Sequence, residues 1–372
     1  MLTYKIYIMR RLILLTSFNF FMSFLVSAKP IRVGIAGMTH NHINQVFDYM
    51  GKQDEVEVVG FAEPNRELAM RLLKQHHLPD SLWFSSLAEL IEKTRPAAVC
   101  AFNSIYEHLE VVKICAPKGI HVIVEKPLAV NNDHLNQMLT LVKKYSIQLL
   151  TNFETTWYPS HAKVWEMVKK EKSLGTIRKV VFKDGHKGPI EIGCTKEFTD
   201  WLTDPVQNGG GALVDFGCYG ANIMTWLMDA QKPISVTAVT QHLKPTVYPK
   251  VDDEASIILT YPNCQAIIQA SWNWPFGVKD SEVYGTDGIL IANRENKMKY
   301  IAGEQKEKET WLDLSPLPHE RSNIFSYLAA VVNGKINPGN DLSSLPVNGI
   351  VVEILSAAKE SAKTGKTIYL NK

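Results

Sequence analysis

The chain has 372 residues, of which 45% are hydrophobic and 21% are charged, so it can form two globular domains with sizeable cores. Its 40 basic and 38 acidic residues give a net charge of only +2, which excludes a bulk attraction to nucleic acid or to an anionic membrane. This balance favours a small-molecule partner. The five cysteines are widely spaced and form neither a disulfide framework nor a zinc-binding pattern.

Residues 1–28 have the pattern of a secretory signal peptide. Arg10 and Arg11 precede an apolar run that ends at Val26, and small residues up to Ala28 resemble a cleavage site. A retained anchor is the weaker alternative, because the run is shorter than the roughly 20 residues of a spanning helix. The sequence therefore predicts an exported, periplasmic protein with no membrane anchor after processing.

Residues 29–153 alternate short apolar strands with amphipathic helices. We expect strands at Ile31–Ala36, Val56–Ala62, Ala97–Ala101, around Val122 and at Ile147–Thr151. We expect helices at about Ile43–Met50, Arg66–Gln75, His108–Ala116 and Asp133–Tyr145. This alternation is typical of an α/β protein with the doubly wound parallel sheet of a Rossmann domain, which binds nucleotides.

The turn after the first strand departs from the dinucleotide fingerprint. Gly37 can supply the tight turn, but the second and third glycines of G-x-G-x-x-G are replaced by Thr39 and His42. A helix that begins after the turn still offers backbone N–H groups to a pyrophosphate. His40 is a candidate polar partner of phosphate or substrate, and a surface or capping role is equally open. No metal site is expected, because the histidines here lack a partnered cysteine or carboxylate spacing, namely His40, His42, His76 and His77.

Glu63 ends the second strand, 26 residues after Gly37. A carboxylate near this position hydrogen-bonds the ribose 2′-hydroxyl of NAD and repels the 2′-phosphate of NADP. We therefore favour NAD, while Arg66 keeps NADP possible. An exposed glutamate at the start of a helix is the alternative.

The segment Gly119–Ala129 contains a β-branched strand that stops at Glu125-Lys126-Pro127. Ligands of open α/β sheets bind at the carboxyl ends of the strands, so Glu125 and Lys126 are candidate site residues. Pro127 ends the strand and can orient the lysine, for example through a cis peptide bond. A simple surface turn is the alternative.

Residues 154–372 predict an α+β domain with a large, open, mostly antiparallel sheet. Alternating segments at Ser235–Gln241, Glu254–Tyr261 and Ala266–Trp274 are separated by turn residues. One face of such a sheet is often covered by another subunit, so we expect a homo-oligomer.

Three glycines at 209–211 precede Asp215 and Tyr219, which lie four residues apart before an apolar helix, Ile223–Met228. On a helix these two side chains share one face and can converge on one ligand. A buried aspartate that caps the helix is the alternative.

These blocks, in this order, resemble the Gfo/Idh/MocA oxidoreductase family, named for glucose–fructose oxidoreductase and inositol dehydrogenase. The likeness covers nearly everything after residue 30, including Gly37, the Gly119–Ala129 and 209–219 blocks, 251–255 and 285–288. It implies a Rossmann domain that binds NAD(P) and a second domain with an open sheet. Lys126 then matches the lysine at nicotinamide and substrate, with Glu125 as its neighbour in the cofactor site.

The resemblance also implies that Asp215 contacts substrate hydroxyls and that Tyr219 exchanges a proton in hydride transfer to or from a sugar, glycoside or cyclitol. A tyrosine that acts as a base near neutrality needs a nearby cation, for which Lys126 is the candidate. Trp157, Tyr158 and His186 are further substrate-side candidates, because aromatic faces suit sugar rings; each can equally belong to the core.

Export separates the enzyme from the cytoplasmic pool of free NAD(H). We therefore expect a tightly bound cofactor in a redox-neutral cycle, such as sugar–sugar transhydrogenation or glycoside cleavage through a 3-keto intermediate. A non-catalytic sugar-binding protein with a decayed nucleotide site is the alternative from another class.

Overall fold

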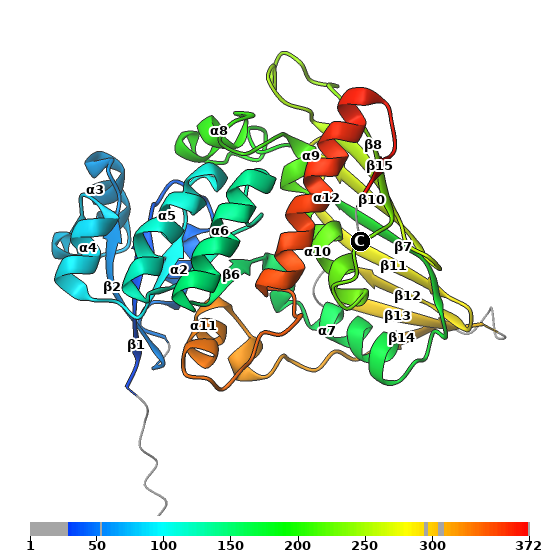
Figure 1. The fold of residues 1–372 in the computed structure, drawn as a ribbon, viewed down its shortest axis with the longest axis horizontal. Helices are drawn as coiled ribbons and strands as arrows, with labels where there is room; N and C mark the ends of the chain where they lie inside the picture. Colours follow the sequence, from blue (N-terminus) through cyan, green and yellow to red (C-terminus); the bar gives the residue numbers. More distant parts are fainter. Residues whose placement is uncertain (1–28, 53, 294–296, 304–308, 371–372) are drawn as a thin grey trace, which may run out of the picture. The chain divides into compact units, whose positions relative to one another are not determined.

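A computed structural model describes residues 29–52, 54–293, 297–303 and 309–370 (Figure 1). The predicted signal peptide, residues 1–28, lies outside the described residues. Residues 31–372 form one unit that contains two sheets. Among the described residues, no helix combines the length and the apolar character that crossing a membrane requires.

The first sheet has six parallel strands in the order β3-β2-β1-β4-β5-β6. The strands are β1 (Ile31–Ala36), β2 (Val56–Ala62), β3 (Trp83–Phe84), β4 (Ala98–Ala101), β5 (His121–Glu125) and β6 (Leu149–Asn152). The chain runs outward from β1 to β3 and then crosses back to β4, which lies on the other side of β1. The carboxyl ends of β1 and β4 therefore form a topological switch point, where doubly wound sheets bind ligands. The predicted Rossmann-type fold is confirmed.

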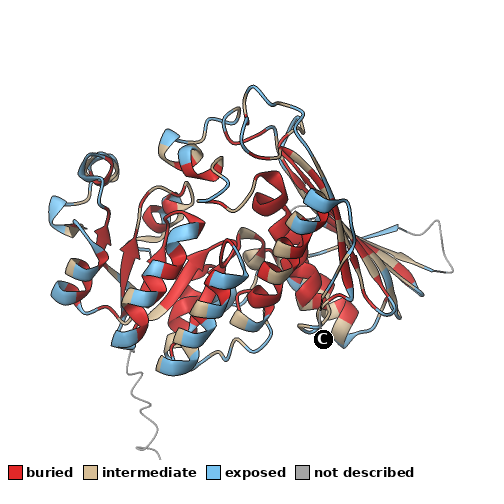
Figure 2. Ribbon diagram, turned by 45° about the horizontal axis from the view of Figure 1, so that its top comes forward, coloured by how far each residue is buried: buried red, intermediate tan, exposed pale blue. Residues whose placement is uncertain are grey.

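Helices cover both faces of this sheet. They are α2 (Ile43–Tyr49), α3 (Arg66–Gln75), α4 (Leu87–Thr94), α5 (His108–Cys115) and α6 (Asn132–Tyr145). The helix α4 and the two-residue strand β3 were not predicted from the sequence. Side-chain caps fix several starts: the Asn131 side chain accepts the His134 N–H at 2.9 Å before α6. Figure 2 shows buried residues along the strands and exposed residues on the outward sides of the surface helices.

The second sheet has nine strands in the order β14-β13-β12-β11-β7-β10-β9-β8-β15 and is mostly antiparallel, as predicted. The strands are β7 (Ile177–Gly185), β8 (Ser235–Gln241), β9 (Glu254–Thr260), β10 (Gln265–Ser271), β11 (Val278–Gly285), β12 (Gly288–Asn293), β13 (Lys297–Ala302), β14 (Glu309–Leu312) and β15 (Ile368–Tyr369). Burial alternates along β9 and β10, because one face packs on helices and the other is half-exposed.

Figure 1 shows the helices α9, α10 and α12 on one face of the second sheet. The helices of this part are α7 (Pro159–Trp165), a π-helical turn η5 (Glu166–Lys170), α8 (Lys196–Leu202), α9 (Ala212–Asp215), α10 (Gly217–Leu227), α11 (Ile324–Val332) and α12 (Leu345–Thr364). Single 3-10 turns are η1 (Asp80–Leu82), η2 (Ile105–Glu107), η3 (Ala116–Lys118), η4 (Glu154–Trp157) and η6 (His319–Arg321).

Asp215 and Tyr219 do not share one regular helix, contrary to the expectation from their spacing. Asp215 closes the short α9, Phe216 breaks the pattern, and α10 begins at Gly217. A Cβ on Gly217 would lie 2.8 Å from the Ile257 side chain, so the glycine lets α10 start close against β9. The break places Asp215 at a helix end.

The helix α11 packs on the first sheet although it follows the second sheet in sequence. Its residues Phe325 and Leu328 are 2% and 0% exposed and share a core with Ile35 and Phe61. Burial of each such side chain stabilises the fold by about 1.5–3 kcal/mol. The carboxy-terminal part of the chain therefore completes the core of the amino-terminal sheet.

Candidate active site

The carboxyl end of β5 delivers a buried lysine to the space between the two sheets. Lys126 follows β5, is 6% exposed and forms a cis peptide bond with Pro127. Its Nζ donates hydrogen bonds to Asp215 Oδ1 at 2.5 Å and to the Asp215 carbonyl oxygen at 3.1 Å. The structure thus joins residues 89 positions apart in the chain, one from each sheet region.

Mutual pairing keeps both groups charged. Burial by itself lowers the pKa of Lys126, but the Asp215 carboxylate outweighs it and raises that pKa above its ordinary value. Burial by itself raises the pKa of Asp215, and Lys126 reverses this to a net lowering. Trp272 Nε1 donates to the other carboxylate oxygen of Asp215 at 2.9 Å, which fixes its orientation.

Tyr219 lies beside this pair and is 2% exposed. The Lys126 Nζ lies 5.0 Å from its ring centroid, and the Lys279 Nζ lies 4.7 Å from it. Burial, together with the Glu154 carboxylate, raises the pKa of Tyr219 well above its ordinary value. Lys126 lies near the ring, as the sequence predicted, but burial raises this pKa despite the cation, which favours the neutral phenol.

A cavity of about 760 Å³ is lined by Tyr158, His186, Phe216 and Lys279. Phe216 and Lys279 connect it to the cluster, because both lie against the Tyr219 ring. Tyr158 and His186 are two of the residues that the sequence predicts on the substrate side. Burial lowers the pKa of His186, so its imidazole is neutral near pH 7. Its Nδ1 accepts the Gly188 N–H at 2.9 Å, which leaves the proton on Nε2.

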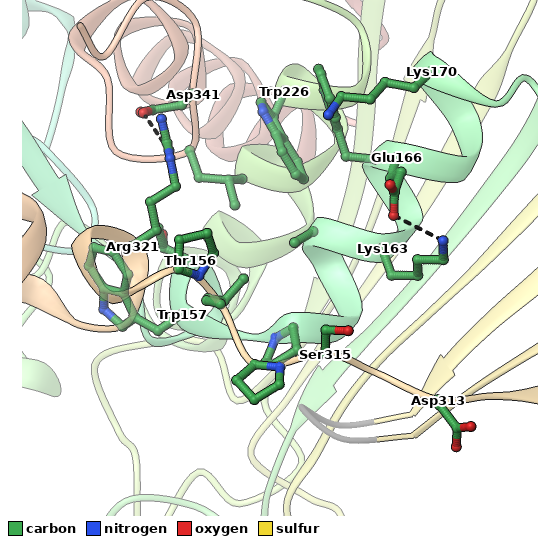
Figure 3. A pocket seen from close by; sticks show the side chains of 17 residues that line it. Thr156, Trp157, Lys163, Glu166, Lys170, Trp226, Asp313, Ser315, Arg321 and Asp341 are labelled. Atoms are coloured by element: carbon green, nitrogen blue, oxygen red, sulfur yellow. Dashed lines mark hydrogen bonds and ion pairs between the residues drawn. The ribbon is translucent and has the colours of Figure 1, made fainter. Parts of the chain in front are cut away.

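Trp157 does not line this cavity, unlike Tyr158 and His186, the other two substrate-side candidates. It lines a separate cavity of about 620 Å³ with Trp226 and Arg321 (Figure 3). Its Nε1 donates to Asn152 Oδ1 at 3.0 Å. Trp157 ends the 3-10 turn η4 and Tyr158 follows it, so the two consecutive side chains diverge into different cavities.

The turn after β1 has the backbone of a nucleotide-binding turn. Gly37 has a φ of 78°, and a Cβ there would lie 2.5 Å from the Asn103 Cβ, so only glycine fits. Thr39, two residues after Gly37, is half-buried. Glu63 is 4% exposed and accepts the N–H of Met38 at 2.8 Å and of Asn65 at 2.9 Å. Glu63 thus ties the turn to the start of α3.

The switch point between β1 and β4 fits a polar ligand. Asn103 follows β4, and its buried Oδ1 has no hydrogen-bond partner among the described residues. The buried Nε1 of Trp201, on α8, also lacks a partner within the described ranges. Trp201 packs on His40 of the turn, with ring centroids 5.5 Å apart. Asn103 and Trp201 thus both lie against the turn after β1, and a bound dinucleotide would pair such unsatisfied buried polar atoms.

Two family models match this chain in succession. The oxidoreductase family with the NAD-binding Rossmann fold matches residues 31–153, and the GFO/IDH/MocA C-terminal domain matches residues 161–291. The chain belongs to the GFO/IDH/MocA oxidoreductase family. Its first sheet is therefore an NAD-binding Rossmann domain, in agreement with the switch-point geometry.

Curated relatives of this family member include dehydrogenases of vertebrates. The trans-1,2-dihydrobenzene-1,2-diol dehydrogenase of Xenopus laevis is 28% identical over 235 residues, which cover 63% of this chain and 66% of the relative. The enzyme of the same name from Sus scrofa is 24% identical over 234 residues, covering 62% and 65%. The match thus spans just under two thirds of the length of these relatives.

Solved structures of the family share the fold. An inositol dehydrogenase homolog complexed with NAD+ from Azotobacter vinelandii has a TM-score of 0.81 at 17% identity, with 92% of this chain and 98% of that chain covered. The aldose-aldose oxidoreductase from Caulobacter crescentus complexed with glycerol has a TM-score of 0.77 at 18% identity, with 92% and 100% covered.

Sequence reasoning missed three charged residues of the site. Lys279, on β11, forms an ion pair with Glu154, which also accepts the Tyr158 hydroxyl. Burial opposes this, but Lys279 lowers the pKa of Glu154 to about 2. Asp184, on β7 opposite Lys279, is 2% exposed, and burial raises its pKa well above the ordinary value. These residues belong to ordinary strand and turn segments without a motif, so only their meeting in space marks them.

Glu125 precedes Lys126 in this GFO/IDH/MocA member. Its side chain is held by a cluster of polar side chains. It accepts Asn152 Nδ2 at 2.6 Å and lies 2.9 Å from His42 Nδ1. With His40 these groups are close enough to hold a metal ion. However, His40 Nδ1 accepts the His42 N–H at 3.0 Å, so the proton sits on Nε2, the nitrogen nearer Glu125. Ligation through Nε2 would require the other tautomer and would break the hydrogen bond to the His42 N–H. The absence of a metal stays a prediction.

Proposed function

We propose that this chain is an NAD-dependent oxidoreductase that transfers hydride to or from a hydroxyl-bearing carbon of a sugar, glycoside or related polyol. The observation that carries the proposal is the buried contact of Lys126 with Asp215 beside Tyr219. The Tyr219 ring also contacts Lys279, which lines the same cavity as His186. Fixed donors and acceptors that converge in one cleft suit a substrate with several neighbouring hydroxyls.

Each residue has a distinct role in this proposal. A bound nicotinamide supplies the hydride chemistry. Lys126 donates to the substrate oxygen on which negative charge develops, and it is held there by Asp215. Asp215 also accepts from a neighbouring hydroxyl. Tyr219, as a neutral phenol, donates its proton when a carbonyl is reduced; oxidation in reverse requires it to be deprotonated first.

The charge around the turn favours NAD over NADP. Glu63 is a buried carboxylate at the end of β2, where a 2′-phosphate would meet a like charge. Arg66, which left NADP open, lies over the Trp83 ring with its Cζ 5.4 Å from the centroid. Its guanidinium is thereby placed on an aromatic face.

A redox-neutral cycle with a retained cofactor is supported by the segment around α8. Glu197 pairs with Arg71 of α3 at 2.5 Å, and the Thr195 hydroxyl bonds to Asn41 of the turn at 2.8 Å. This segment therefore crosses the edge at which the dinucleotide would bind. One structural neighbour is an aldose-aldose oxidoreductase. Glycoside cleavage through a 3-keto intermediate is a second route that uses the same retained cofactor.

Export and self-association remain part of the proposal. Export rests on the signal-peptide pattern of residues 1–28. A homo-oligomer is supported by the half-exposed face of the second sheet, where Ile258, Ile267 and Ile291 alternate with buried residues. Size-exclusion chromatography with light scattering would measure the assembly.

Heating the purified protein and identifying the released small molecules by mass spectrometry tests the proposal directly. We expect NAD(H) in the supernatant, and keto products from a panel of sugars and glycosides when a second sugar is supplied as the hydride acceptor that reoxidises the bound cofactor. Lys126→Ala is expected to abolish the keto products. Release of no nucleotide, together with turnover of no substrate, would favour the non-catalytic sugar-binding alternative. Steady accumulation of free NADH with product would exclude the redox-neutral cycle.

A further inference from the structure

The proposed substrate cleft has room for more than one ring. Its volume of about 760 Å³ lies in the upper part of the range for sites that bind whole drug-sized ligands. The inner end is the end at Lys279, whose Nζ lies 4.7 Å from the Tyr219 ring centroid, and the Lys126 Nζ lies 5.0 Å from the same centroid. The reacting carbon therefore belongs at this end. A single sugar ring at that end leaves the outer part unfilled.

The outer end of the cleft is built differently from the inner end. Phe276, just before β11, lines it with a side chain that is 62% exposed. Lys279, three residues further on, has a side chain that is only 19% exposed. Three residues of chain reach at most about 10 Å, so the cleft passes from the buried reaction centre to an exposed aromatic face within that length.

Polar side chains line the same cavity as Phe276. Asn293 lies opposite Asp280 and Lys297 lies opposite Asn293 in the strand register, near the start of β11 that Phe276 precedes. An aromatic face beside polar side chains suits a ring that is apolar on its face and polar at its edge. We propose that the substrate is a glycoside, and that Phe276 is the platform for the second ring, attached to the anomeric oxygen of the reacting sugar.

This assignment rests on the proposed function. It makes Phe276 a specificity residue and not a catalytic residue. The second ring does not react, so its contact with Phe276 is equally strong in the ground state and in the transition state. Such uniform binding lowers KM and leaves kcat unchanged. An aromatic contact of this kind changes affinity about three- to tenfold.

Pairs of methyl and phenyl glycosides of the same sugar, for several sugars, test the platform. We expect the wild-type protein to have a three- to tenfold lower KM for the phenyl glycoside. Phe276→Ala should remove this preference by raising only the KM for the phenyl compound. Trp311→Ala is the matched control, since Trp311 is also 62% exposed but does not line the cleft, and it should change neither value.

The inference is overturned if the wild-type protein turns over both members of a pair with equal KM. It is also overturned if Phe276→Ala raises the KM of both members equally. A lower oligomer mass of Phe276→Ala in light scattering would also overturn it, because the residue then serves a subunit contact. Calorimetric titration of both glycosides separates the two proposals. Phe276-dependent binding without any turnover would support the platform and refute the proposed reaction.

Discussion

The turn after β1 and the cluster of Lys126, Asp215 and Tyr219 belong to the same structural unit. Different interactions hold them in place. Backbone N–H groups hold the turn: Met38 and Asn65 donate to the buried Glu63. Charged side chains hold the cluster, where Lys126 and Asp215 pair at 2.5 Å.

This difference explains why the two regions depart so unequally from the family pattern. Backbone donors remain when a side chain changes, so the turn can carry Thr39 and His42 where the fingerprint has glycines. A buried ion pair cannot lose one partner, because the remaining charge keeps its desolvation cost without its compensation. Side-chain replacements should therefore be severe in the cluster and mild in the turn.

Asp215→Ala is expected to have the largest effect. It leaves the Lys126 ammonium buried without an anion, which should lower the free energy of unfolding by about 3–5 kcal/mol and kcat/KM by about 10³-fold. Urea unfolding and steady-state kinetics measure both. Asp200→Ala is the control, because its pair with Lys196 has side chains 61% and 82% exposed and should contribute less than about 1 kcal/mol. Equal losses in the two variants would contradict the contrast.

Tyr219→Phe separates chemistry from packing within the cluster. The ring keeps its contacts with two ammonium groups while the proton donor is lost, so kcat should fall by at least about 10²-fold with little change in unfolding free energy. Single-turnover kinetics give the rate. Tyr248→Phe is the control: that buried tyrosine donates to Glu191, outside the cleft, and its loss should leave kcat intact.

The pH dependence should differ between the two reaction directions. Burial raises the pKa of Tyr219 well above its ordinary value, so the phenol stays protonated from acid to alkaline pH. Carbonyl reduction uses the protonated form, and its kcat/KM should be flat from about pH 6 to 9 and fall only above the raised pKa. Oxidation uses the deprotonated form and should rise about tenfold per pH unit over the same range. A plateau of the oxidation rate near pH 7 would show that another group is the base.

Glu63→Gln probes the turn and should have the smallest effect. The amide keeps one acceptor oxygen but loses the charge, so the dissociation constant of NAD should rise about tenfold. The dissociation constant of NADP should rise less, because repulsion of its 2′-phosphate is removed. Calorimetric titration with both nucleotides measures the ratio. An unchanged preference for NAD would show that Glu63 acts only within the turn.

The sequence by itself determined the features that depend on near neighbours in the chain. Apolar periodicity located the strands β1 and β2 and the helix α3 to the residue, and Pro127 marked where β5 delivers its lysine. These features are local, because strand and helix periods and the φ restriction of proline act over a few residues. The family resemblance added the pairing of Lys126 with the distant Asp215 and Tyr219.

Only the tertiary structure decided the charges and the cavities. Groups from distant segments of the chain meet in three places that the sequence did not show. They are the pairing of Lys279 with Glu154, the surroundings that raise the pKa of Tyr219, and the separate cavity that Trp157 lines. Burial and Coulomb interactions depend on distance in space and on the exclusion of water, which one-dimensional periodicity does not encode. The sequence therefore supplied the reactive groups, and the packing of two sheets decided their protonation and what they face.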